Sequence, residues 1–224
     1  MLNICERKKS AQRFLKFHFK GDCPHMFDEN LALTAKTSKC FVCKRACVIN
    51  KQRPDILSAG LPCQPFSKAR RQNGATPKTG SPETHPLWGT SMVEFCETLK
   101  ARAPHVFIVE EVLGFAQPCE HLLGLSPAKA LAKMVKKLGY GITAVELDHA
   151  MFVNMSRPRC WLIGVSAGSG GQEGADWIGR QISLVAQEVE KFKKLKPINV
   201  FDVVDINDAA EIERRPHGAK ALLN

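Results

Sequence analysis

Pro62-Cys63-Gln64-Pro65 places a cysteine thiol on a short segment with a proline on each side. Proline fixes φ and carries no backbone N–H, so Pro62 and Pro65 favour a rigid loop that holds the thiol in one direction. A thiolate is a strong nucleophile, which makes Cys63 a candidate for covalent catalysis. The alternative is that Cys63 is a small buried side chain, as most free cysteines are.

Four charged side chains farther along the chain are of types that stabilise charge on a reacting group. Glu110 and Glu111 end one apolar run, and Arg157 and Arg159 precede another. Consecutive strand residues point to opposite faces, so one of the two carboxyl groups at most can face a shared site. Apolar surroundings would raise the pKa of such a carboxyl and make it a proton donor, and arginine keeps its charge. Taken singly, these side chains are more often solvent-facing residues at strand ends.

The element that must position Cys63 is a short apolar run over 55–59, which Gly60 and Pro62 stop. This pattern is typical of a buried parallel strand that ends in a loop. Further strands are expected over 2–6, 25–28, 106–112, 142–147 and 160–165, with helices over 8–19, 87–100, 128–138 and 176–195. Alternation of this kind predicts an α/β fold, in which ligands bind beyond the carboxyl ends of the strands.

Each of the first two expected strands ends in an acid, Glu6 at the end of 2–6 and Asp28 at the end of 25–28. An acid at a strand end of a nucleotide-binding sheet commonly binds ribose hydroxyl groups. Asp28 is equally suited to cap a helix over 29–35. The next segment, 36–53, shows no clear period and is expected to be a long connection.

The segment Pro62-Cys63-Gln64-Pro65-Phe66-Ser67 resembles the catalytic motif of the cytosine-C5 DNA methyltransferases. The resemblance implies that Cys63 adds to C6 of a cytosine, so that C5 can take a methyl group from S-adenosylmethionine. Glu110-Glu111-Val112 is similar to the ENV motif of the family, which implies that Glu110 holds N3 of the base. Glu111 stands where the family has asparagine.

Two further matches extend the resemblance. Met155-Ser156-Arg157-Pro158-Arg159 is similar to the QxRxR motif, which implies that Arg157 and Arg159 hold cytosine O2 or a phosphate; methionine replaces the usual glutamine. For the cofactor, the resemblance implies that Glu6 binds the ribose, that Asp28 contacts the adenine amino group and that Pro62 lines the site.

The resemblance covers residues 1–165 and implies a Rossmann-like S-adenosylmethionine-dependent methyltransferase fold with a mostly parallel sheet. The family opens with a strand and a DLFAGxGG segment, which the sequence from Met1 does not contain, so the first strand of the family fold is expected to be missing. Residues 166–224 are expected to form a linker over 168–174, a helix and an irregular tail, without a recognition domain. The basic, polar segment 68–86 is expected to be a mobile loop, either solvated or closing over nucleic acid.

The composition agrees with a protein that binds a polyanion. The 224 residues are 44% hydrophobic, enough for one α/β domain with an appendage, and carry a formal net charge of +10. The expected partner is double-stranded DNA with a flipped cytosine; a basic surface also suits RNA or an anionic membrane. A long apolar run and a signal-like start are missing, so we expect a soluble protein inside the cell, in the nucleus, or in the cytoplasm of a prokaryote.

Cys40, Cys43 and Cys47 form a CxxCxxxC run with Cys23 and His25 upstream as candidate fourth ligands. Such a run can hold zinc. A second CxxC pair is missing, and this favours incidental cysteines, so no metal is expected.

Three functions remain open from the sequence. The preferred one is a DNA (cytosine-5-)-methyltransferase. The second is an inactive fragment or pseudoenzyme that only binds nucleic acid, and the third is a tRNA cytosine-C5 methyltransferase, which would share the nucleophile.

Overall fold

The computed structural model describes residues 4–19, 21, 23, 25–63, 66, 87–118, 122, 124–151 and 156–191. The loop expected over 68–86, Met155 and the tail from 192 lie outside these residues. The elements in chain order are β1 (Ile4–Cys5), α1 (Lys9–His18), β2 (Met26–Phe27), the 3-10 helix η1 (Asn30–Thr34), β3 (Thr37–Lys39), β4 (Ala46–Val48), β5 (Ile56–Gly60), α2 (Leu87–Arg102), β6 (Val106–Val112), η4 (Leu113–Phe115), α3 (Pro127–Lys136), β7 (Tyr140–Asp148), η6 (His149–Met151), β8 (Pro158–Ser166), η7 (Ala167–Ser169) and α4 (Gly171–Lys191).

The largest sheet has the strand order β5-β6-β8-β7. β5 and β6 are parallel, and β8 is antiparallel to both β6 and β7. Three of these strands therefore run in one direction and β8 runs in the other. The predicted α/β class is confirmed, with a mixed sheet in which β5–β6 is the parallel pair.

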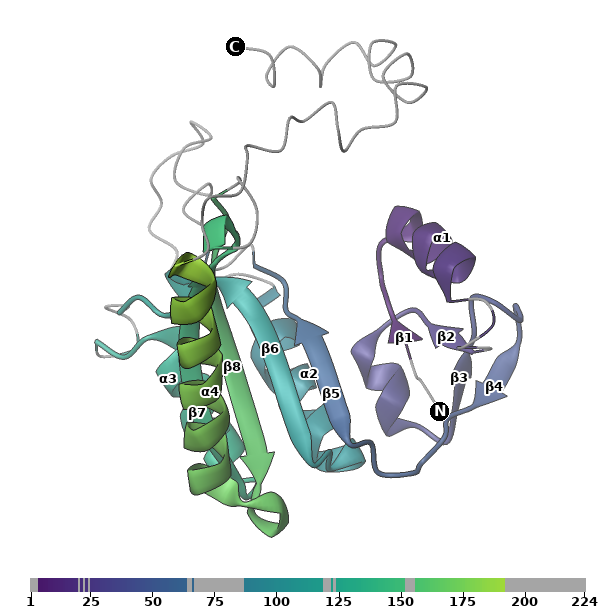
Figure 1. Ribbon diagram of the computed structural model, residues 1–224. Coiled ribbons are helices and arrows are strands. Elements are labelled where there is room, and N and C mark those ends of the chain that lie inside the picture. The colour runs from purple at the N-terminus through teal and green to yellow at the C-terminus, as the bar shows by residue number, and fades with distance from the viewer. Residues whose placement is uncertain are drawn as a thin grey trace, which may run out of the picture.

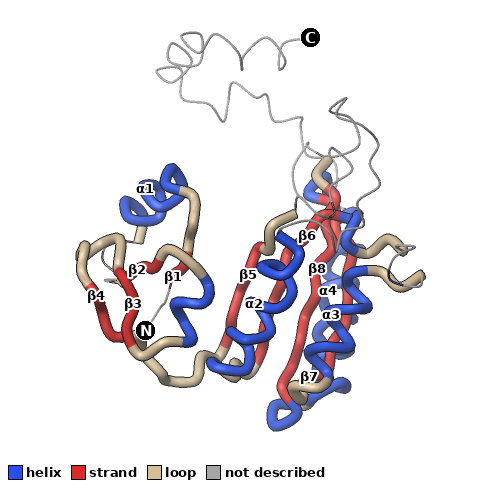
Figure 2. The backbone as a smooth tube through the Cα atoms, turned by 180° about the vertical axis from the view of Figure 1, so that it is seen from behind, coloured by secondary structure: helices blue, strands red, loops and turns tan. Residues whose placement is uncertain are grey.

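Helices cover both faces of this sheet. α2 and α3 lie on one face, and α4 lies on the other over β7 and β8 (Figure 1; Figure 2). The core between the sheet, α2 and α3 contains the fully buried side chains of Phe95, Phe107, Val109 and Leu131. Apolar burial of this kind is the main stabilising contribution to an α/β domain.

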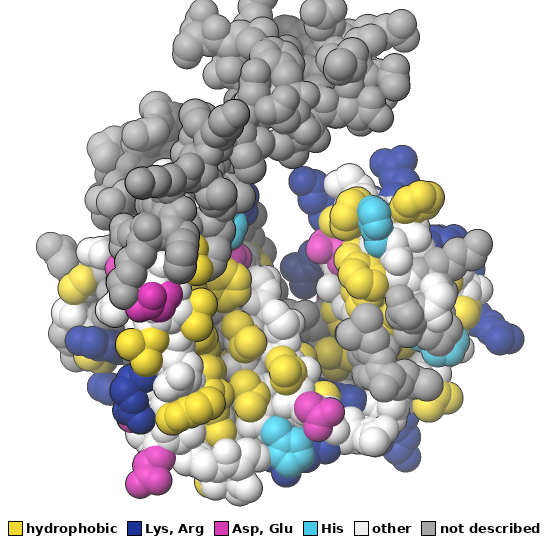
Figure 3. Space-filling view, in the orientation of Figure 1, with side chains coloured by type: hydrophobic (Ala, Val, Ile, Leu, Met, Phe, Trp, Pro, Cys, Tyr) yellow, Lys and Arg dark blue, Asp and Glu magenta, His cyan; other side chains and the backbone are white. Residues whose placement is uncertain are grey.

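The face that α4 covers is open over β5 and β6 in the described part of the chain. Figure 3 shows apolar side chains between α4 and the N-terminal elements, and Ile56 of β5 is 60% exposed. Leu57 and Ala59 point the other way and pack against the core. Side chains at the carboxyl ends of β5 and β6 on this open face are therefore within reach of a ligand.

The first elements form a separate small unit. β1 pairs with β2 in parallel, and β3 pairs with β4 as an antiparallel hairpin. The predicted connection over 36–53 is therefore wrong in part, because strands of three residues are too short to show a period of two. Phe27, Leu33, Cys40 and Ile49 form a core of this unit.

The small unit contacts the larger one through η1 and α2. At its edge Arg7 Nη2 lies 3.9 Å from Glu94 Oε2. The helix expected over 29–35 is a 3-10 helix, and Asp28 provides no side-chain cap to it.

The prediction of a linker over 168–174 is wrong for its second half, because α4 begins at Gly171. Gln172 of α4 exchanges two hydrogen bonds with the backbone of Ile142 on β7, at 2.9 and 3.2 Å. A Cβ at Gly179 would lie 2.8 Å from Thr143 Cγ2, so this glycine permits close approach of the helix to the sheet. Within the expected linker, Gly170 and Gly171 adopt positive φ values of 113° and 52° at the start of α4, and a Cβ at Gly174 would lie 3.2 Å from Val165 Cγ1. Composition alone does not distinguish such glycines from those of a flexible segment.

Among the helices within the described ranges, none is both long enough and apolar enough to span a membrane.

Candidate active site

Glu110 and Arg159 form the centre of the candidate site. Arg159 Nε donates a hydrogen bond of 2.6 Å to Glu110 Oε1, in an ion pair whose side chains are 19% exposed for Arg159 and 32% for Glu110. A partly exposed pair of this kind contributes little stability. The main effect of the ion pair is to fix two charged groups relative to each other at the carboxyl end of β6.

Strand register explains why these residues meet. Val112 pairs with Arg159 across β6 and β8, and Glu110 lies two residues before Val112 on the same face of β6. Because β8 runs antiparallel to β6, its first residues lie beside the carboxyl end of β6. The predicted convergence of Glu110 and Arg159 at one edge is therefore observed.

Cys63 lies just beyond the carboxyl end of β5, at the same end of the sheet. Gly60, the last residue of β5, pairs with Glu110, and a Cβ built on Gly60 would lie 3.8 Å from Glu110 Oε2. Pro62 and Cys63 follow within three residues, and both are partly exposed. The nucleophile candidate is therefore on the loop next to the carboxyl group, as the strand-and-loop pattern predicts.

Packing holds the far end of this loop in place. The Phe66 N–H donates to the Cys63 carbonyl oxygen at 2.9 Å, and the buried Phe66 ring meets the Phe115 ring edge to face at 4.6 Å. A Cβ at Gly114 would overlap the Phe66 carbonyl oxygen. The segment after β6 therefore supports the loop that carries Cys63, a contact that the sequence motif did not reveal.

Glu111 is the buried acid of the pair. It is 1% exposed, and burial raises the pKa of its carboxyl to about 8. Its Oε2 accepts a hydrogen bond from the Val112 N–H at 2.9 Å, and its Oε1 is buried without a hydrogen-bond partner in the described structure. The sequence suggested apolar surroundings for the acid of the site. In the structure Glu111 has these surroundings, whereas Glu110 forms an ion pair with Arg159.

Arg157 lies at the margin of this group. The residue is exposed, and its backbone N–H donates to Asp148 Oδ1 at 2.6 Å. Asp148 also accepts from Ser156 Oγ at 2.7 Å, so the end of β7 is bonded to the two residues that precede β8. A role of the Arg157 side chain stays a prediction.

Glu6 and Asp28 lie at the carboxyl ends of β1 and β2, two adjacent parallel strands. Gln12 joins them: its Nε2 donates to the Glu6 carbonyl oxygen at 2.6 Å and to Asp28 Oδ1 at 2.8 Å. Glu6 Oε1 accepts from the Lys8 N–H at 2.6 Å, and Lys9 Nζ lies 3.5 Å from Asp28 Oδ1. The two predicted cofactor acids are therefore brought together.

Gln12 was missed by the sequence reasoning, although a signal exists. It is 5% exposed and lies on the face of α1 that also carries Leu15 and Phe19. A polar residue at an apolar position of an amphipathic helix indicates a buried hydrogen-bonding role.

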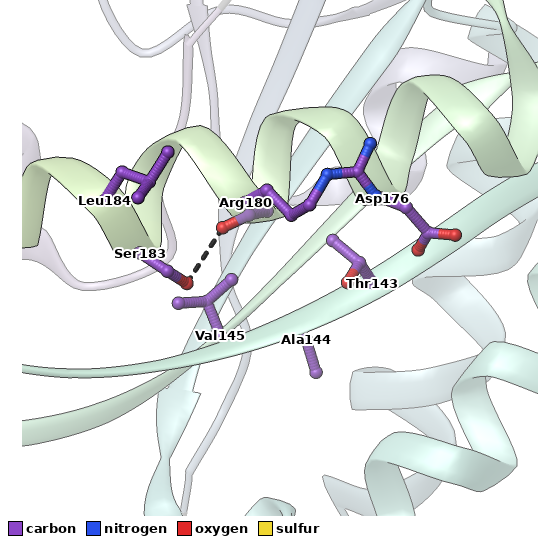
Figure 4. A pocket seen from close by; sticks show the side chains of 8 residues that line it. Thr143, Ala144, Val145, Asp176, Arg180, Ser183 and Leu184 are labelled. Atoms are coloured by element: carbon purple, nitrogen blue, oxygen red, sulfur yellow. Dashed lines mark hydrogen bonds between the residues drawn. The ribbon is translucent and has the colours of Figure 1, made fainter.

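A hollow between α4 and β7 lies away from these residues (Figure 4). Thr143, Val145, Arg180 and Leu184 line it, and Ser183 Oγ beside it donates to the Gly179 carbonyl oxygen at 2.9 Å. None of the predicted site residues contributes to its lining. Glu110, Arg159 and Cys63 are instead grouped at the carboxyl ends of β5 and β6, and Glu6 and Asp28 lie in the small unit.

Comparison with known proteins identifies the family of this chain. The profile of the C-5 cytosine-specific DNA methylase family matches residues 6–220. The chain therefore belongs to this family.

Individual relatives match a shorter stretch. The Type II methyltransferase M.PspPI of Psychrobacter sp. is 34% identical over 113 residues, which is 50% of this chain and 24% of that protein. The Type II methyltransferase M.BanI of Aneurinibacillus aneurinilyticus is 31% identical over 112 residues, 50% of this chain and 23% of that protein. The matched stretch thus spans about a quarter of the length of these relatives.

Among solved structures, a mutant of DNMT2 from Spodoptera frugiperda superposes with a TM-score of 0.46 at 16% identity, over 75% of this chain and 43% of that chain.

Proposed function

We propose that this chain is the catalytic part of a DNA (cytosine-5-)-methyltransferase. The observation that carries the proposal is the Glu110–Arg159 ion pair of 2.6 Å beside the loop of Cys63, in a chain whose family match spans residues 6–220. The M.PspPI and M.BanI relatives are described as Type II methyltransferases, which supports the same activity.

In the proposed reaction the Cys63 thiolate adds to C6 of a cytosine, forming a C–S bond and moving electron density toward C5, N3 and O2. The Glu110 carboxyl group would donate a hydrogen bond or a proton to N3 as that charge develops, and the Arg159 guanidinium would donate hydrogen bonds to O2. When bound, S-adenosylmethionine supplies an electrophilic methyl group for C5. Loss of the C5 proton to a base and cleavage of the C–S bond then restore the Cys63 thiolate and the aromatic ring.

The residues in the small unit fit the cofactor. Adenosine offers two ribose hydroxyl groups and an adenine amino group, all hydrogen-bond donors, and Glu6 and Asp28 are acceptors at adjacent strand ends. Pro62 would line the same site from the catalytic loop. Lys9 balances the charge of Asp28 at 3.5 Å, which leaves the second carboxylate oxygen for a donor.

The proposed partner is double-stranded DNA from which the target cytosine is flipped, because C6 cannot be reached inside the base stack. The net charge of +10 supports a polyanionic partner. The Psychrobacter and Aneurinibacillus relatives are bacterial, which favours the cytoplasm of a prokaryote over the nucleus.

A trapping experiment tests the nucleophile. DNA containing 5-fluorocytosine cannot lose its C5 substituent as a proton, so the C6 adduct should persist after methylation. Wild-type protein should form a complex that survives denaturing electrophoresis, and Cys63→Ala should form none. Cys96→Ala, a change at a half-buried cysteine of α2, serves as the matched control and should trap normally.

Trapping by Cys63→Ala equal to wild type would refute the proposal. A trap with fluorocytosine RNA and none with DNA would favour the tRNA alternative.

Calorimetry with S-adenosylmethionine separates an enzyme from a pseudoenzyme. We expect saturable binding that falls on the order of tenfold in Asp28→Asn, because the variant replaces a charged acceptor with a neutral one. An exposed acid outside the site, Glu146, provides the control Glu146→Gln. Absence of binding to the wild-type chain would favour the inactive alternative.

A further inference from the structure

A second group of chemically active side chains lies in the small N-terminal unit. His25 precedes β2, Cys40 follows β3, Cys43 lies in the hairpin turn and Cys47 lies in β4. Their ligand atoms all lie within 4.8 Å of one another. Three sulfur atoms and an imidazole nitrogen thus converge from separate segments, whereas the sequence favoured incidental cysteines.

The spacing of these atoms fits tetrahedral coordination. Zinc binds sulfur at about 2.3 Å and nitrogen at about 2.0 to 2.1 Å, which places tetrahedral neighbours roughly 3.5 to 3.8 Å apart. His25 Nδ1 lies 3.4 Å from Cys43 Sγ and 4.0 Å from Cys40 Sγ. These two distances fall on either side of the expected separation, and all four ligand atoms lie within 4.8 Å of one another, so an ion fits with side-chain adjustments of about an ångström or less.

The backbone of the hairpin turn is arranged around one sulfur. The Cys43 N–H points at Cys40 Sγ at 3.4 Å, and the N–H groups of Lys44 and Cys40 bond the carbonyl oxygens of Cys40 and Arg45, both at 2.9 Å. Lys44 adopts a φ of 61°, an uncommon value for a residue with a side chain. A donor aimed at sulfur favours a thiolate, which is the form that binds metal.

The structure also selects the fourth ligand. Cys23, the other candidate, is fully buried and its sulfur donates to the His25 carbonyl oxygen at 3.0 Å, outside the group. His25 turns Nδ1 toward the thiols, so Nε2 would carry the ring proton. Cys40 and Cys47 are buried and His25 and Cys43 are partly exposed, which leaves one open side for an ion to enter.

We propose that His25, Cys40, Cys43 and Cys47 form a structural zinc site. Three thiolates and one imidazole suit Zn²⁺, and four protein ligands leave no position for substrate, as in structural sites. The ion would join β2 to the β3–β4 hairpin, two segments that also meet through the bridge between Phe27 and Cys40 and through a hydrogen bond of 2.9 Å from the Phe41 N–H to the Met26 carbonyl oxygen.

The site has a clear structural purpose. The unit around it has a small core, and units of this size commonly depend on a metal or a disulfide. His25 lies three residues before Asp28, so the ion would fix the strand end that presents Asp28. This proposal concerns stability of the unit and stands apart from the methyltransferase activity.

Metal analysis of the full chain, expressed with zinc and freed of any affinity tag, tests the proposal. We expect about one zinc per chain after passage over a chelating resin, and a loss on the order of tenfold in His25→Ala and Cys43→Ser, which change partly exposed residues. Cys23→Ala and Cys96→Ala should retain the metal. Replacement of zinc by cobalt should give the absorption of a tetrahedral centre with sulfur-to-cobalt charge transfer.

Wild-type chain without bound metal would overturn the proposal, and so would equal retention in Cys43→Ser. The cobalt spectrum needs only the wild type, so the test holds even if a ligand variant fails to fold. An octahedral spectrum, or a disulfide within the group in freshly purified reduced protein, would also contradict the site.

Discussion

At the scale of single residues, two neighbouring acids have opposite environments. Glu110 faces the open edge and bonds Arg159, while Glu111 is buried beneath it and its pKa is raised to about 8 by burial. The alternation of side chains along β6 is sufficient to separate them. At neutral pH the Glu111 carboxyl is largely protonated. Glu111 is therefore mostly uncharged, like the asparagine that the family has at this position.

Glu111 makes protein stability depend on pH. Its folded pKa of about 8 is above the ordinary value of 4.5, so folding protonates the group and wild-type stability falls as pH rises between these values. Glu111→Gln removes this loss, and its stability relative to wild type should increase by roughly 3 to 4 kcal/mol from about pH 5 to about pH 8. Urea denaturation at several pH values measures the difference.

Glu146→Gln, at an exposed position of β7, is the control and should show a constant difference from wild type over that range. A difference for Glu111→Gln that does not change with pH would show that Glu111 ionises normally.

At the scale of elements, the loop of Cys63 depends on a contact with η4. Gly114→Ala would place a methyl group against the Phe66 carbonyl oxygen, and backbone cannot rotate away as a side chain can. We expect the Cys63–Phe66 turn to shift, with a loss on the order of a hundredfold in the trapping rate. Thermal unfolding and the trapping rate should be measured together.

Gly168→Ala is the matched control, because a Cβ there meets no atom within 4 Å. Trapping by Gly114→Ala at the wild-type rate would mean that η4 does not position the loop.

The elements also show which features the sequence can predict. Strands β5, β6, β7 and β8 follow from apolar runs, and α3 begins where Ser126 Oγ accepts from the Lys129 N–H at 3.2 Å, as its Ser-Pro start predicts. The β3–β4 hairpin was not predicted, because strands of three residues are too short to show the two-residue alternation of apolar and polar side chains. The start of α4 was not predicted, because in the sequence the glycines at a helix start, Gly170 and Gly171, look the same as those of a flexible linker.

At the scale of the whole molecule, both candidate centres depend on contacts that local sequence does not specify. Glu110 and Arg159 are far apart in sequence, and only the β6–β8 register places them together. The family resemblance supplied that pairing in advance. The group of His25, Cys40, Cys43 and Cys47 had no such guide, because it forms only when the hairpin folds back on β2.

The proposed cofactor acids and the proposed catalytic loop belong to different units, which contact each other through η1 and α2. The proposed methyl transfer requires both to act on the same ligand pair. The central claim is that Cys63, among nine cysteines, is the one that attacks the base.

Mass spectrometry of peptides from the trapped 5-fluorocytosine complex tests this claim most directly. We predict that the modified, methylated base is attached to the peptide that contains Cys63 and to no other. Attachment to a different cysteine, or a stable complex whose Cys63 peptide is unmodified, would contradict it.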